Sequence, residues 1–88
     1  MCRNIRTLFN FEPPATDEEI RASALQFVRK LSGFTSPSKV NEAAFHQAVD
    51  DVSDAANRLL ESLETSRPAR DREAEAMKAR VRARERFA

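Results

Sequence analysis

The chain has few of the residues that build tight turns, disulfides and metal sites. Its 88 residues include one glycine, one cysteine and one histidine, with neither tryptophan nor tyrosine. One glycine and four prolines supply little of the turn chemistry that β-hairpins need, which argues against an all-β fold. A single cysteine and a single histidine exclude an intrachain disulfide and a zinc site built from several such ligands. We therefore expect no metal and no cofactor.

Long apolar runs are also missing. No stretch of about 18 apolar residues occurs, so the sequence predicts no membrane-spanning helix. The first residues lack the apolar segment of a secretory signal peptide. We expect a cytoplasmic protein with a reduced thiol, and a chain of this length forms one small domain at most.

Two segments carry apolar residues at helical spacing. In the first, Thr16 and Glu19 form a capping box and Gly33 offers a left-handed stop, which predicts a helix over 17–32. The second stripe begins at Phe45 and predicts a helix over about 39–64. We expect Ser36 or Asn41 to cap this second helix. The short link between the two helices favours an antiparallel hairpin.

The two ends of the chain differ from this hairpin. Pro13 and Pro14 predict that residues 1–15 form an extended arm. Pro68 is suited to open a third helix over about 69–86, which is rich in alanine, arginine and glutamate. The predicted fold is all-α, a small helical hairpin or three-helix domain. Residues 1–66 form its core and arm, and residues 67–88 form a basic helix or tail.

Because this hairpin is small, its core needs further cover. The apolar residues of the arm, Leu8, Phe9 and Phe11, can pack across both helices. Alternatively, two chains can pair along the second helix.

Charge is unevenly divided along the chain, although the net charge is only +1. Residues 8–65 carry ten acidic and five basic side chains, whereas residues 66–88 carry eight basic and four acidic ones. Seven of those eight cations are arginines, whose planar fork suits phosphate. An acidic body with basic ends can bind a polyanion or the body of a neighbouring copy.

With these segments in view, the chain resembles a family of small bacterial proteins of unknown function. The resemblance is carried by the MCRNI start, the NFEPPAT segment, the EEIRASALQFVRKLSGF helix, the SPSKVNEAAF junction and the RPARD element of residues 67–71. It covers nearly the whole chain and implies a soluble bacterial protein. It supplies no catalytic residues.

The basic tail gives the main functional prediction, a non-enzymatic protein that binds DNA or RNA. Arginine-rich segments bind nucleic acid by releasing counterions from phosphates. The residues expected to contact phosphates are Arg3, Arg6, Arg70, Arg72, Lys78, Arg80, Arg82, Arg84 and Arg86. Ion pairs within the tail would instead give only a solvated helix, at Arg72–Glu75, Glu75–Lys78 and Arg82–Glu85. Contacts with the acidic patch of Asp50, Asp51 and Asp54 would also neutralise the tail.

Two further interpretations stay open. The arm interleaves arginines with Phe9 and Phe11, which either stack on unpaired bases or belong to the core. The main alternative function is a protein-interaction module or homodimer that uses the second helix and the charged tail. A more distant alternative is an enzyme that uses the thiol of Cys2.

Overall fold

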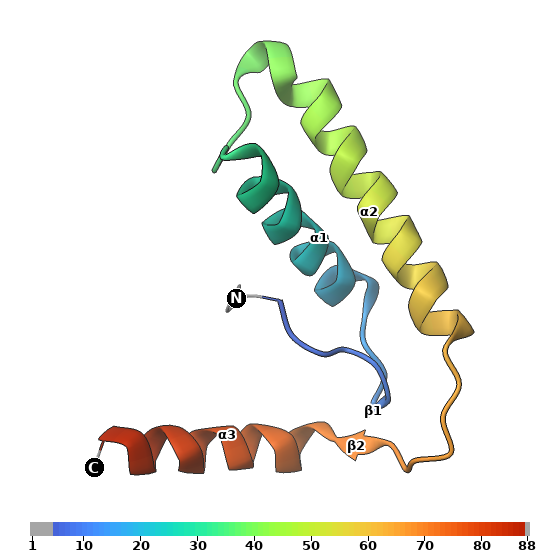
Figure 1. Cartoon of the computed structure of the whole chain (residues 1–88), viewed down its shortest axis with the longest axis vertical. Coiled ribbons are helices and arrows are strands. Elements are labelled where there is room, and N and C mark those ends of the chain that lie inside the picture. Colours follow the sequence, from blue (N-terminus) through green and yellow to red (C-terminus); the bar gives the residue numbers. More distant parts are fainter. Residues whose placement is uncertain (1–4, 88) are drawn as a thin grey trace.

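The protein is a helical hairpin with a third helix crossing one end. The computed structural model describes the backbone of residues 5–87 and the side chains of residues 5–86. Its elements are β1 (Phe11–Glu12), α1 (Asp17–Ser32), the 3₁₀ turn η1 (Lys39–Asn41), α2 (Glu42–Ser62), β2 (Arg70–Asp71) and α3 (Arg72–Phe87). Helices α1 and α2 run antiparallel, and α3 lies across the end of the hairpin near β1 and β2 (Figure 1). The all-α prediction is confirmed.

Local signals at both ends define α1. The backbone N–H of Glu19 donates to Thr16 Oγ1 at 3.2 Å, and the backbone N–H of Thr16 donates to Glu19 Oε1 at 3.0 Å. Gly33 ends the helix in the left-handed region at φ 80°, and its N–H donates to the carbonyl of Arg29 at 2.9 Å. The predicted bounds, 17–32, are those of the structure.

The start of α2 differs from the prediction. Residues 39–41 form a 3₁₀ turn, and the α-helix begins only at Glu42 and ends at Ser62. Asn41 occupies the N-cap position but makes no capping hydrogen bond, and its backbone is already helical at φ −103° and ψ −1°. Its side-chain amide donates to Ser38 Oγ at 2.8 Å. The prediction of Asn41 as the N-cap residue is confirmed in position, but the side-chain capping bond is absent and Ser36 does not cap the helix. The 3₁₀ turn leads directly into the helix in its place.

The core lies between the facing stripes of the hairpin. Ile20, Ala24 and Val28 of α1 are buried, as are Phe45 and Val49 of α2. Leu25, Ala48 and Val52 pack against this cluster while keeping part of their surface in water. Spacings of three and four residues bring these side chains to one side of each helix. The core is small, and the stability of the hairpin depends on few side chains.

The arm and the third helix meet at a short parallel strand pair that the sequence did not predict. Phe11 is paired with Arg70 and Glu12 with Asp71. Asn10, at φ 64°, turns the arm into this pairing. Its carbonyl accepts the N–H of Arg70 at 2.8 Å, and its side-chain amide donates to the carbonyl of Pro68 at 3.1 Å.

This pairing also moves the start of the third helix. Pro68 does not open α3, because Arg70 and Asp71 are extended in β2. Instead, Asp71 Oδ1 accepts the backbone N–H of Ala74 at 2.8 Å and caps the helix, which begins at Arg72.

The arm covers the hairpin only in part. Leu8 lies with Ile20 and Leu60 around a groove between the arm and the hairpin. This position agrees with the prediction that the arm packs across both helices. Phe9 and Phe11 are half-buried and do not belong to the buried core. Pairing with β2 draws Phe11 toward α3 instead.

Candidate nucleic-acid interface

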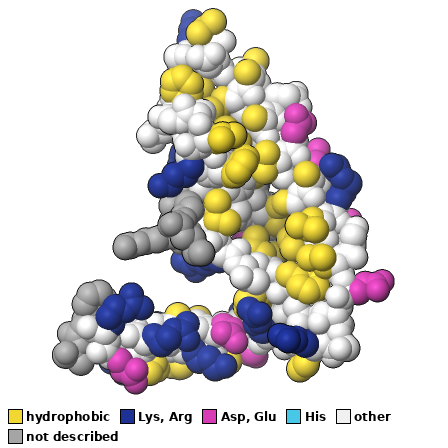
Figure 2. Space-filling model, in the orientation of Figure 1, with side chains coloured by type: hydrophobic (Ala, Val, Ile, Leu, Met, Phe, Trp, Pro, Cys, Tyr) yellow, Lys and Arg dark blue, Asp and Glu magenta, His cyan; other side chains and the backbone are white. Residues whose placement is uncertain are grey.

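Helix α3 carries its cations in two rows. Lys78, Arg82 and Arg86 follow one another at four-residue spacing along one side, and Arg80 and Arg84 do so along another. All five side chains are exposed. Figure 2 shows Lys and Arg side chains spread along α3, which extends away from the hairpin. This part of the helix presents a strong positive charge to solvent.

An apolar stripe separates the two rows. Met77 and Val81 lie on the face between them and are exposed by 53% and 40%. Helical spacing brings Ala74 to the same face of α3. The stripe faces solvent, because the hairpin lies on the opposite side of α3, toward Glu75 and Ala79.

Arg72 is held by the rest of the chain. Its Nη1 donates to Glu19 Oε2 at 2.9 Å, and its Nη2 lies 2.9 Å from Glu19 Oε1. Its Nε donates to the carbonyl of Pro13 at 2.6 Å. The hydrogen bond from Arg72 lowers the pKa of Glu19 to about 2 and raises the pKa of Arg72 itself. The predicted Arg72–Glu75 pair is wrong, because the guanidinium reaches the carboxylate of α1 instead.

Phe11 is covered by arginines. The guanidinium carbon of Arg70 lies 5.5 Å from the centre of the ring, and that of Arg72 lies 5.9 Å away. Both distances fall within the range of cation–π contacts. Base stacking on Phe11 would have to displace these guanidinium groups, so the aromatic ring serves to hold the strand junction.

A groove joins the arm to α3. It is about 460 Å³ in volume, and its lining includes Arg6, Phe11, Glu75 and Arg82. Arg6 and Arg82, far apart in the sequence, therefore face the same space. Arg3, another predicted phosphate contact, lies outside the described residues. Cys2, the thiol of the distant enzyme alternative, lies outside them too.

Two acids within the tail, Glu75 and Glu85, differ in whether they form the predicted ion pairs. The predicted Glu75–Lys78 pair is present, with Lys78 Nζ 3.7 Å from Glu75 Oε1. Among the residues that the structure describes, no ion pair joins Arg82 to Glu85.

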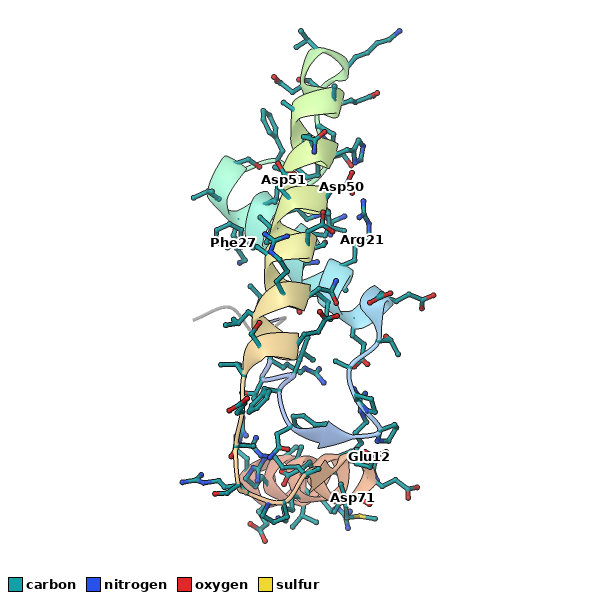
Figure 3. The ribbon with its side chains drawn as sticks, turned by 90° about the vertical axis from the view of Figure 1, so that its right-hand side faces the viewer. Glu12, Arg21, Phe27, Asp50, Asp51 and Asp71 are labelled. Carbon is teal, nitrogen blue, oxygen red and sulfur yellow. The ribbon has the colours of Figure 1, made fainter. Side chains whose placement is uncertain are left out.

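Within the described part of the chain, no ion pair joins the acidic patch of α2 to the tail. Asp50 accepts a 2.6 Å hydrogen bond from Arg21 of α1, and Asp51 accepts one from Gln47. Figure 3 shows Arg21 and Asp50 pointing toward each other on one side of the hairpin.

The described residues also bear on metal binding and on membrane insertion. No group of three or more His, Cys, Asp or Glu side chains there is arranged to hold a metal ion. No helix in this part of the chain combines the length and the apolar character needed to cross a membrane.

Fold and surface together define a small mainly helical protein, a hairpin that carries a basic third helix. The chain belongs to the DUF2277 family, described as an uncharacterized conserved protein, whose sequence profile matches residues 1–78. This match confirms the resemblance to a family of unknown function. The arginines at positions 80, 82, 84 and 86 lie beyond the matched residues. No curated protein and no solved structure matches the chain.

Proposed function

We propose that α3 binds the phosphate backbone of DNA or RNA without catalysing a reaction. The observation that carries this proposal is the pair of exposed cation rows, Lys78–Arg82–Arg86 and Arg80–Arg84, on a helix that extends away from the hairpin. Five cations over residues 78–86 are opposed there by one acid, Glu85. Such a density favours counterion release from a polyanion.

The geometry suits a helix placed between two phosphate walls. The major groove of B-DNA is about 12 Å wide and admits one α-helix. With cations on two sides of α3, each row faces one wall, and the stripe of Met77 and Val81 lies between them. Arg6 adds a cation beside Arg82 at the arm. Phosphate contacts carry no direct sequence information, and the stripe lacks the hydrogen-bonding side chains that distinguish base edges, so the proposed binding is weakly selective.

Arg72 has no part in this interface, since Glu19 and Pro13 hold its guanidinium. Arg70 contributes only at the edge, because its side chain lies over Phe11. The proposal therefore rests on the distal part of α3 and on Arg6.

The test is a titration of the full chain against fluorescently labelled duplex DNA and against an RNA hairpin, each at two salt concentrations. The double variant Arg82→Ala/Arg86→Ala is compared with wild type. Its salt slope should fall by about 2, because each lost phosphate contact removes about one unit. Arg58→Ala, which removes an exposed cation of α2, is the matched control and should leave the slope unchanged.

Absence of binding to both probes at about 50 mM salt rejects the proposal, since electrostatic binding is strongest there. Equal losses from Arg58→Ala and from the double variant also reject it. That result would place the contacts outside α3.

A further inference from the structure

The two broad faces of the hairpin have opposite character. One face carries the ion pair of Arg21 and Asp50, with the exposed ring of His46 near it. The other face carries Phe27, and Figure 3 shows Phe27 on the side of the hairpin opposite Arg21 and Asp50. Figure 2 shows hydrophobic side chains gathered along that second face, over both helices.

This apolar face is continuous along the hairpin. It contains two shallow grooves of about 360 and 310 Å³, which share Phe27 and Val52 in their linings. Leu31 and Leu59 border the grooves and are exposed by 77% and 56%. Among the lining residues that the structure describes, Arg6 is the one charged side chain. Large contiguous apolar surfaces of this kind mark interaction sites.

The chain also exposes more surface than its mass predicts. Its accessible area is 7287 Å², whereas a compact monomer of 10.0 kDa exposes about 5,200 Å². The protruding α3 accounts for part of the difference. The whole difference exceeds the area, about 800 Å² per partner, that a standard protein interface buries.

We propose that a second copy of the chain covers this face, so that two hairpins pack into a four-helix bundle. A two-fold interface sets a surface against itself, which requires a surface free of concentrated charge of one sign. The apolar face meets this requirement. The outer surface of α2 carries an excess of acids, and α3 carries an excess of cations. Both surfaces are therefore less suited to self-pairing than the apolar face is.

The edges of the apolar face are complementary in charge. Lys30 lies beyond Phe27 and Leu31 on the edge formed by α1, whereas Asp51 and Asp54 outnumber Arg58 on the outer side of α2. A two-fold axis along the hairpin places α1 of one copy over α2 of the other. The basic edge of each copy then lies beside the acidic edge of its neighbour. This arrangement favours a second copy of the chain over a partner whose surface carries charge of one sign.

The experiment is sedimentation equilibrium of the full chain at about 100 µM without nucleic acid, a concentration at which a moderately stable dimer is populated. We expect twice the 10.0 kDa chain mass for wild type and the chain mass for Leu31→Glu. Val40→Glu is the matched control, because Val40 is 89% exposed and does not line the grooves. It should remain dimeric.

A monomeric wild type overturns the proposal and shows that the face has another occupant. A dimeric Leu31→Glu variant, or a monomeric Val40→Glu variant, also overturns it, because dissociation would then not report on this face. Circular dichroism checks that the variants stay helical. Should Leu31→Glu unfold, Leu59→Glu takes its place with the same expected mass. Binding of nucleic acid by α3 is independent of all these outcomes.

Discussion

Arg72 and Glu19 form a two-pronged ion pair that ties the first turn of α3 to the first turn of α1. The two nitrogens of the guanidinium each lie 2.9 Å from a different oxygen of the carboxylate. The same carboxylate also accepts the backbone N–H of Thr16 in the capping box. The side chain of Glu19 thus helps to begin α1 and to anchor α3. Arg72 in turn binds the arm through the carbonyl of Pro13.

Replacing Arg72 by lysine should loosen the arm and β2 while leaving the hairpin intact. Lysine keeps the charge but lacks the planar fork that contacts both Glu19 and Pro13. We expect amide hydrogen exchange to become severalfold faster in the β1 and β2 segments and to stay unchanged around Val49. Hydrogen-exchange mass spectrometry measures this directly. Arg67→Lys, in the same exposed segment, is the control, and an equal effect there would contradict the role given to Arg72.

The ion pair should also give the docked arm a specific pH dependence. Contact with Arg72 lowers the pKa of Glu19 from its ordinary value of 4.5 to about 2. A lowered pKa in the folded state means that the contact stabilises the fold fully above the ordinary value and is lost as pH falls toward 2. An NMR titration of the Glu19 carboxyl carbon should show a midpoint near 2 in wild type. The midpoint should be higher in Arg72→Lys, and an ordinary midpoint in wild type would count against the pair.

The extent of α1 could be predicted from sequence because its signals are local. Thr16, Glu19 and Gly33 act on backbone groups within four residues of themselves, so spacing alone identifies them. The two-residue strands gave no comparable signal. Strands of two residues are too short to show the alternation of apolar and polar residues that predicts a strand. Phe11 and Arg70 are brought together only by the tertiary fold. Asn10 at positive φ is the one local hint, since asparagine tolerates that region.

The arrangement of cations along α3 could also be predicted from local spacing. Four-residue spacing places Lys78, Arg82 and Arg86 in one row whatever the rest of the chain does. The partner of Arg72 was not predictable, because spacing favours the nearby Glu75 and says nothing of a carboxylate 53 residues away. Contacts of that kind depend on how α3 docks.

Gly33→Ala should destabilise the protein by about 1 kcal/mol, through backbone conformation alone. Gly33 has φ 80°, and a Cβ built there meets nothing within 4 Å. The cost therefore comes from the left-handed backbone and not from a clash. Urea denaturation measures the change in the free energy of unfolding. Gly33→Asn should cost less, and an alanine variant as stable as wild type would show that the chain ends α1 in another way.

The strongest effect on stability should come from Phe45, because the buried core has so few members. Phe45 is 6% exposed and packs with Val49 and the buried face of α1. Phe45→Ala removes apolar area and leaves a cavity, which typically costs about 3–5 kcal/mol. Domains of this size have only about 5–15 kcal/mol of stability, so the variant should unfold at far lower urea than wild type. Val40→Ala, at an exposed position, should change the free energy of unfolding by less than about 0.5 kcal/mol. Similar losses from both substitutions would mean that the hairpin is not held together by the interface between α1 and α2.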